Sequence, residues 1–170
     1  MERKSLKRKI WEMIDERKEE IVALCSDMIS IPSDNPPGDT TKLAKFLIDY
    51  LEQRELQVDI YEPLEGSPNL VATIEGSQQG PHLVLNGHLD QFPAEVGEKW
   101  NVGPYSGLVK EGRIYGRGAG DMKGGDTGLI TSFCLIKEMD LDFPGKVTLT
   151  LVSDEENGGL WGRLANKQSS

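Results

Sequence analysis

The sequence has few of the residues on which several common active sites depend. Among its 170 residues there are two cysteines and two histidines. It has no Cys-x-x-Cys pair, no His-Glu-x-x-His motif and no Gly-x-Ser-x-Gly turn. These absences exclude paired-thiol redox chemistry, a zinc protease motif carried by one helix, and a serine-hydrolase elbow. We expect Cys25 and Cys134 to be buried free thiols, because both lie in apolar, helix-like stretches.

Positive charge is also scarce. The formal net charge is −9 and the isoelectric point is near 4.8. Nucleic-acid affinity depends on Lys and Arg displacing counterions, so we expect no nucleic-acid partner. The basic run from Arg3 to Lys9 is predicted to be a solvated helical turn, since acidic residues follow it. No apolar run approaches 18 residues and no signal-peptide core is seen, so we expect a cytoplasmic protein without a membrane partner.

The hydrophobic pattern predicts one α/β domain with a genuine core. Apolar residues recur at helical spacing from Leu6 to Met28, which favours one long amphipathic helix before the proline-rich segment Ile31–Asp39. Further helices are expected at residues 40–54 and 122–139. Strands are expected at residues 58–61, 69–75, 82–86 and 146–152, with a short hairpin at 107–110 and 113–115.

Three polar clusters stand where predicted strands should end. They are Gly-His-Leu-Asp at 87–90, Gly-Ala-Gly-Asp-Met-Lys-Gly-Gly at 118–125 and Ser-Asp-Glu-Glu-Asn-Gly-Gly at 153–159. In an open α/β sheet, ligands bind in the crevice at the carboxyl ends of the strands, so the three clusters can converge. One histidine and several carboxylates meeting there would suit a metal ion.

The first cluster holds His88 and Asp90. In an extended backbone their side chains point to the same side, while Leu89 points away. A carboxylate beside an imidazole fixes its tautomer and raises its basicity, as is common around metals. By itself the motif is equally consistent with a histidine and an aspartate that bond to each other for structural reasons alone.

The second cluster centres on Asp121, which follows a glycine-rich stretch and precedes a predicted helix. Its carboxylate could bind a metal, cap the helix N-terminus, or do both. A phosphate-binding loop of the Walker type is excluded, because Lys123 is preceded by Met122 and followed by Gly124.

The third cluster contains the adjacent pair Glu155 and Glu156. At a strand end the two side chains point in different directions, so one could bind a cation while the other faces a substrate. A solvated acidic turn is the simpler interpretation of this cluster alone. The three clusters taken together favour a metal site.

The order and spacing of these clusters, with the segments 100–107, 112–118 and Ile31–Asp39, closely resemble one family. It is the group of acetylornithine deacetylase, succinyl-diaminopimelate desuccinylase, aminoacylase and carboxypeptidase G, which are dinuclear zinc metallopeptidases. The resemblance runs from about Ile21 to Gly162. It implies a zinc exopeptidase-like α/β fold with three layers, helix–sheet–helix, around a mostly parallel twisted sheet with some antiparallel strands.

The resemblance also implies roles for individual residues. His88 corresponds to a ligand of one metal, Asp121 to the ligand shared by both, and Glu156 to a ligand of the other. Asp90 corresponds to the carboxylate that supports the histidine, and Glu155 to the general base. The implied cofactor is a pair of Zn2+ ions, with Co2+ or Mn2+ as alternatives, and the implied substrate is an N-acyl amino acid or small peptide hydrolysed at its amide C–N bond.

Members of that family continue well beyond this length. The resemblance therefore implies that residues 1–170 form the N-terminal portion of the catalytic domain, without the lid or dimerisation domain and the rest of the catalytic domain. A homodimer is expected for the full-length form. With Asp121 shared, the residues present supply two ligands to each metal, fewer than the three usual for catalytic zinc. We expect this chain alone to bind metal weakly and to hydrolyse little.

Two other functions remain open from the sequence. The chain could be a non-catalytic remnant of that fold, acting as a binding or interaction module, with its acidic clusters serving as caps and turns. It could also be a nucleotide-binding domain that uses the glycine-rich loop. Zinc uptake that depends on Asp121 would favour the metallohydrolase over the non-catalytic remnant.

Overall fold

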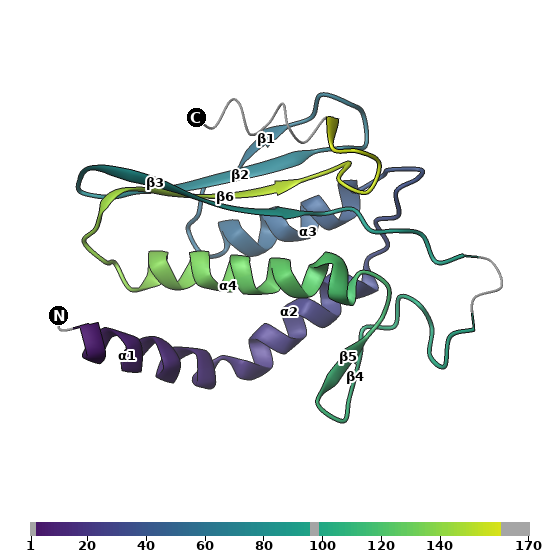
Figure 1. The fold of residues 1–170 in the computed structure, drawn as a ribbon, viewed down its shortest axis with the longest axis horizontal. Coiled ribbons are helices and arrows are strands. Elements are labelled where there is room, and N and C mark those ends of the chain that lie inside the picture. The colour runs from purple at the N-terminus through teal and green to yellow at the C-terminus, as the bar shows by residue number, and fades with distance from the viewer. Residues whose placement is uncertain (1–2, 96–98, 161–170) are drawn as a thin grey trace.

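The computed structural model describes residues 3–95 and 99–160 (Figure 1). Most predicted elements are confirmed within a few residues. The helices are α1 (Arg3–Glu16), α2 (Lys18–Ser30), α3 (Thr41–Glu52) and α4 (Gly124–Glu138). The strands are β1 (Asp59–Tyr61), β2 (Asn69–Glu75), β3 (Gln78–His88), β4 (Leu108–Lys110), β5 (Arg113–Tyr115) and β6 (Pro144–Val152).

The main sheet has four strands in the order β1-β2-β6-β3, and β4 and β5 form a separate hairpin. β3 and β6 run parallel, whereas β1 with β2 and β2 with β6 are antiparallel. The expected α/β fold with a mixed sheet is confirmed. The expected predominance of parallel strands is wrong for the described residues, because β6 inserts between β2 and β3, which run in opposite directions.

Helices α2, α3 and α4 cover one face of this sheet (Figure 1). The core between them is built from leucine, isoleucine and phenylalanine side chains, including Leu47, Ile130, Phe133, Leu149 and Leu151.

The other face of β6 carries Thr148 and Thr150, whose hydroxyls bond to side chains of neighbouring strands. No helix in the described ranges covers that polar face. The second helical layer expected from the resemblance is therefore not formed by these residues.

The expected single helix from Leu6 to Met28 is divided at Arg17, where the backbone leaves the helical region at φ −103° and ψ 11°. The Arg17 guanidinium donates to the carbonyl oxygen of Met13 at 3.2 Å and pairs with Glu138 at the end of α4. This long-range ion pair accompanies the bend between α1 and α2, which the local hydrophobic spacing does not reveal.

The parallel pairing of β3 with β6 places two of the polar clusters side by side. His88, at the end of β3, is the register partner of Val152, at the end of β6. The backbone N–H of Leu89 then donates to the carbonyl oxygen of Val152 at 2.7 Å. The clusters at 87–90 and 153–159 therefore leave the sheet at the same edge, as the sequence predicted.

Candidate metal centre

His88 lies at the centre of the site and is 4% exposed. Its Nδ1 donates to the backbone carbonyl oxygen of Asp90 at 2.9 Å, and its Nε2 donates to the carboxylate of Asp121. Nε2 lies 3.1 Å from Oδ1 of Asp121 and 4.0 Å from Oε2 of Glu155. Burial opposes the charged imidazolium, but the hydrogen bonds and negative charge of Asp90, with Asp121, raise the pKa of His88 to about 9.

Asp90 is fully buried and joins two of the clusters. Its Oδ1 accepts the backbone N–H of Glu155 at 3.2 Å, and its Oδ2 accepts the backbone N–H of Glu156 at 3.0 Å. Burial works against the charged carboxylate, yet the bonds from His88, Asn35 and these two N–H groups lower its pKa. Asp90 is thus an ionised group that fixes the backbone of the glutamate pair.

Asp121 reaches the site from a distorted turn, Ala119–Lys123, that precedes α4. Its backbone is extended, with φ −135° and ψ 100°, and its side chain is 78% exposed. The helix-cap alternative is wrong, because α4 begins at Gly124 and no side chain caps it. The extended backbone instead directs the carboxylate to the imidazole of His88.

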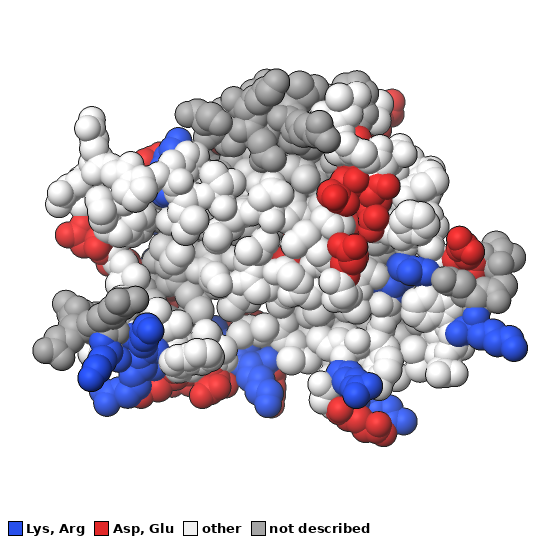
Figure 2. All heavy atoms as spheres, in the orientation of Figure 1, with Lys and Arg blue, Asp and Glu red and all other residues white. Residues whose placement is uncertain are grey.

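The glutamate pair completes an acidic cluster around this imidazole. Glu156 lines a cavity of about 380 Å³ together with Asp121, Phe92 and Trp100. Burial first, and then the negative charges of Asp121, Asp90 and Glu155, raise the pKa of Glu156, while His88 opposes the shift. Acidic side chains also gather on this face near the ends of β3 and β6 (Figure 2). A bound cation would relieve this repulsion.

His88 and Asp121 lie at a separation that suits two ligands of one zinc ion. Two ligands at about 2.0–2.1 Å from a tetrahedral zinc lie about 3.3 Å apart. The 3.1 Å between Nε2 of His88 and Oδ1 of Asp121 is close to that separation, and nitrogen with carboxylate oxygen is a donor set that zinc accepts. Within residues 3–95 and 99–160, no three His, Cys, Asp or Glu side chains converge on one point. His88 and Asp121 therefore fit one zinc ion as a pair of ligands.

Known proteins share much of this sequence. Residues 84–167, which contain all three clusters, match the peptidase family M20/M25/M40. The chain is 32% identical over 148 residues to N-formyl-4-amino-5-aminomethyl-2-methylpyrimidine deformylase of Bacillus subtilis, covering 85% of this chain and 35% of that protein. It is 37% identical over 142 residues to succinyl-diaminopimelate desuccinylase of Sulfurovum sp., covering 84% of this chain and 35% of that protein.

This chain belongs to the M20 peptidase family. The M20 fold is also found in the metallo-carboxypeptidase Sso-CP2 of Sulfolobus solfataricus, which matches with a TM-score of 0.72 and 24% identity over 82% of this chain and 32% of that one. The chain therefore spans about a third of the length of the curated relatives it matches.

Three residues of this M20 site were not found from the sequence. Asn35 donates to Oδ2 of Asp90 at 2.8 Å from the proline-rich segment. Lys123 is fully buried, and its Nζ donates to the carbonyl oxygens of Met28 and Ile31 at the end of α2. Lysine is almost never fully buried, and no residue around Lys123 signals that it is.

Asp126, in the first turn of α4, is the third. It is 1% exposed, and its Oδ1 has no hydrogen-bond partner within the described residues. Burial raises its pKa to about 7, assisted by the charges of Asp90 and Asp121 and opposed by those of His88 and Lys123.

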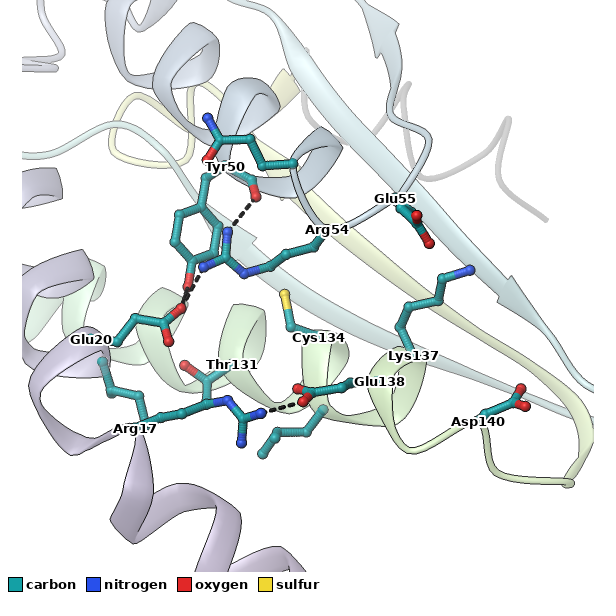
Figure 3. A pocket seen from close by; sticks show the side chains of 13 residues that line it. Arg17, Glu20, Tyr50, Arg54, Glu55, Thr131, Cys134, Lys137, Glu138 and Asp140 are labelled. Atoms are coloured by element: carbon teal, nitrogen blue, oxygen red, sulfur yellow. Dashed lines mark hydrogen bonds and ion pairs between the residues drawn. The ribbon is translucent and has the colours of Figure 1, made fainter.

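A second cavity, of about 480 Å³, lies at the other end of α4 (Figure 3). Its arginines are paired with glutamates, Arg54 with Glu20 and Arg17 with Glu138. The Arg54 guanidinium also lies 3.6 Å from the centre of the Tyr50 ring. These charged side chains neutralise one another and hold the helices together. We therefore assign the catalytic chemistry to the site around His88.

The prediction of buried free thiols is confirmed for Cys25, whereas Cys134 is free but not fully buried. Cys25 and Cys134 are free thiols, the first buried and the second half-buried. Burial raises the pKa of Cys134 to about 11, so its thiol is neutral at ordinary pH. Among the helices of the described ranges, none combines the length and the apolar character needed to cross a membrane.

Proposed function

We propose that this chain carries part of the active site of a metal-dependent hydrolase that cleaves the amide C–N bond of an N-acyl amino acid or small peptide. The observation that carries the proposal is the 3.1 Å approach of Nε2 of His88 to Oδ1 of Asp121, which suits two ligands of one ion. Family membership supports it, as do the names of the relatives, a deformylase and a desuccinylase.

The proposed ligands are His88 for one ion, Asp121 for both and Glu156 for the other. The proposed cofactor is a pair of Zn2+ ions, with Co2+ or Mn2+ as alternatives. When bound, the metal would polarise the substrate carbonyl and lower the pKa of water. The metallo-carboxypeptidase named above supports divalent metal use.

Glu155 is the proposed general base. Its Oε2 lies 4.0 Å from Nε2 of His88, which leaves it facing the same space as the proposed ligands. There it would accept a proton from water and pass that proton to the departing amine nitrogen. Asp90 would hold His88 and the backbone of Glu155 in place through the hydrogen bonds already described.

The extent of the domain belongs to the same proposal. We propose that residues 1–170 form the N-terminal portion of a larger catalytic domain, in keeping with the third of each relative that they span. The longer form is proposed to be a cytoplasmic homodimer that acts on small molecules. The non-catalytic alternative has no support from the comparisons.

The test combines metal uptake with amine release. The chain is titrated with Zn2+ and Co2+, and free amine is measured with N-formyl, N-acetyl and N-succinyl amino acids and with dipeptides. We expect sub-millimolar metal uptake and slow, metal-dependent amine release. Asp121→Ala should lose the uptake, whereas Glu155→Gln should keep it and slow amine release about 100-fold or more.

Asp59→Ala, at an exposed position in β1, is the matched control and should change neither measurement. Absence of metal uptake by the unmodified chain would overturn the proposal and favour the non-catalytic module. A thermal shift with ATP in place of metal would favour a nucleotide-binding domain.

A further inference from the structure

The proline-rich segment lies directly against the end of β3. The Ser33 hydroxyl donates to the carbonyl oxygen of Leu89 at 2.8 Å. The backbone N–H of Asn35 donates to the carbonyl oxygen of Gln91 at 2.9 Å, and the N–H of Gln91 returns to the carbonyl oxygen of Ser33 at 3.0 Å. Residues 33–35 thus pair with the loop that follows His88, through an isolated parallel bridge between Asp34 and Gln91.

This pairing buries the Asn35 side chain, which is 4% exposed. Its Nδ2 donates to Oδ2 of Asp90 at 2.8 Å and lies 3.4 Å from Oδ1 of Asp154. Asp90 and Asp154 are both buried carboxyl groups. One neutral amide group therefore lies between two acids from different clusters.

The amide is itself held in this orientation. A Cβ added to Gly38, which has φ +92°, would lie only 3.2 Å from Oδ1 of Asn35, so the backbone at Gly38 closes over that oxygen. The adjacent Asp34 accepts hydrogen bonds from Gln91 at 2.8 Å and from the Tyr105 hydroxyl at 2.6 Å. These contacts fix the segment that carries Asn35.

The chemistry of the position selects asparagine. A primary amide has two N–H groups, so it can donate to two carboxylates without adding charge. Aspartate would place a third carboxyl group beside Asp90 and Asp154 and would remove both donors. Serine offers one donor and alanine none.

We propose that Asn35 is a positioning residue of the metal centre, acting through Asp90. By holding Oδ2 of Asp90, Asn35 fixes the carboxylate that accepts the N–H groups of Glu155 and Glu156 and lies beside His88. The inference rests on the proposed function, because it concerns the geometry in which those residues meet a metal.

The test uses Co2+, whose visible absorption reports the number and arrangement of its ligands. Asn35→Asp and Asn35→Ala are titrated with Co2+ beside the unmodified chain. We expect about a tenfold weaker affinity, as for other groups that orient metal ligands, and a changed absorption spectrum at saturation. Metal-saturated amine release should fall in kcat with KM changed less than twofold.

A conservative variant separates positioning from general stability. Asn35→Gln keeps the two N–H donors of a primary amide, one methylene farther from the backbone. We expect Asn35→Gln to keep much of the spectrum and of the amine release that Asn35→Asp and Asn35→Ala lose.

Asn69→Ala is the matched control. Asn69 is also a fully buried asparagine, and its amide binds the carbonyl oxygen of Tyr61 and the N–H of Ser153 without contacting Asp90. It should lower the melting temperature but leave the Co2+ spectrum unchanged.

The outcomes separate the two proposals. If the unmodified chain shows no His88-dependent Co2+ spectrum, the metal centre itself is wrong. If that spectrum is present and Asn35→Asp or Asn35→Ala reproduces it with an unchanged kcat, the role of Asn35 is wrong. If neither of those two variants folds, Asn35→Gln decides, because a folded glutamine variant that loses the spectrum would overturn the inference.

Discussion

The backbone N–H of Glu156 donates a hydrogen bond to Oδ2 of Asp90 at 3.0 Å. This bond joins the turn after β6 to the loop after β3, and the neighbouring N–H of Glu155 binds the other oxygen of the same carboxylate. The position of the glutamate pair therefore depends on the charge state and orientation of one buried side chain.

Asp90→Asn should strongly destabilise the fold. The new amide keeps one oxygen and replaces the other with an NH2 donor, so one of the N–H groups of Glu155 and Glu156 loses its acceptor. We expect a loss of about 3 kcal/mol in the free energy of unfolding, measured with urea at pH 7. Asp49→Asn, which removes only an exposed pairing with Lys45, should cost less than about 0.5 kcal/mol. Equal losses in the two variants would contradict the role given to Asp90.

Asp126 should make stability fall as pH rises. Burial raises its folded pKa to about 7 from an ordinary value of 3.8. A raised folded pKa stabilises the protein fully below the unfolded pKa, and that contribution is lost as pH rises through the folded value. Between pH 5 and pH 8, the unmodified chain should lose roughly 2–3 kcal/mol more stability than Asp126→Asn, which stays neutral. Urea unfolding at both pH values checks this, and parallel changes in the two proteins would rule it out.

Lys123→Met should loosen the end of α2. The variant keeps much of the side-chain volume but removes the donors to the carbonyl oxygens of Met28 and Ile31, at 2.9 and 2.8 Å. The carbonyl oxygen of Ile31 loses this donor, whereas that of Met28 keeps the backbone N–H of Ile31 at 3.2 Å. The variant should therefore cost about 1–3 kcal/mol in the free energy of unfolding. Lys137→Met, at an exposed position on α4, is the control and should have little effect. Unfolding in guanidinium chloride measures the difference. An unchanged midpoint concentration for Lys123→Met would show that these hydrogen bonds contribute no net stability.

Gly87 and Asp126 should show strong energetic coupling. A Cβ added at Gly87 would overlap Oδ1 of Asp126, so Gly87→Ala should destabilise by about 2 kcal/mol. In the presence of Asp126→Ala the same change should cost much less, since the overlapping oxygen is gone. Unfolding of the two single variants and the double variant gives the coupling energy. Additive losses would argue against this close packing.

The sequence predicted the parts of the site that depend on strand ends. His88 is the last residue of β3 and Glu155 follows the end of β6, and parallel pairing brings these strand ends to one edge of the sheet. The roles of these residues as base and ligands remain predictions. Their proximity was accessible because period-two hydrophobicity locates strands without knowledge of tertiary contacts.

The features of the fold and the site that the sequence did not predict depend on long-range contacts, which no local pattern contains. The division of the first helix at Arg17 accompanies a pairing with Glu138, 121 residues later in the chain. Likewise, Asn35 looks like an ordinary loop asparagine until the segment 33–35 is seen beside Gln91. Turn chemistry explains why the chain bends there but not which buried carboxylate the amide meets.

The place of β6 in the sheet has a consequence for synthesis of the protein. β6 is the last of the described strands to leave the ribosome, yet it lies between β2 and β3. Until residues 144–152 have emerged, β2 and β3 have no shared neighbour, and their open edges can pair with other nascent chains. We therefore expect yields of soluble protein to improve when chaperones that bind extended segments are co-expressed.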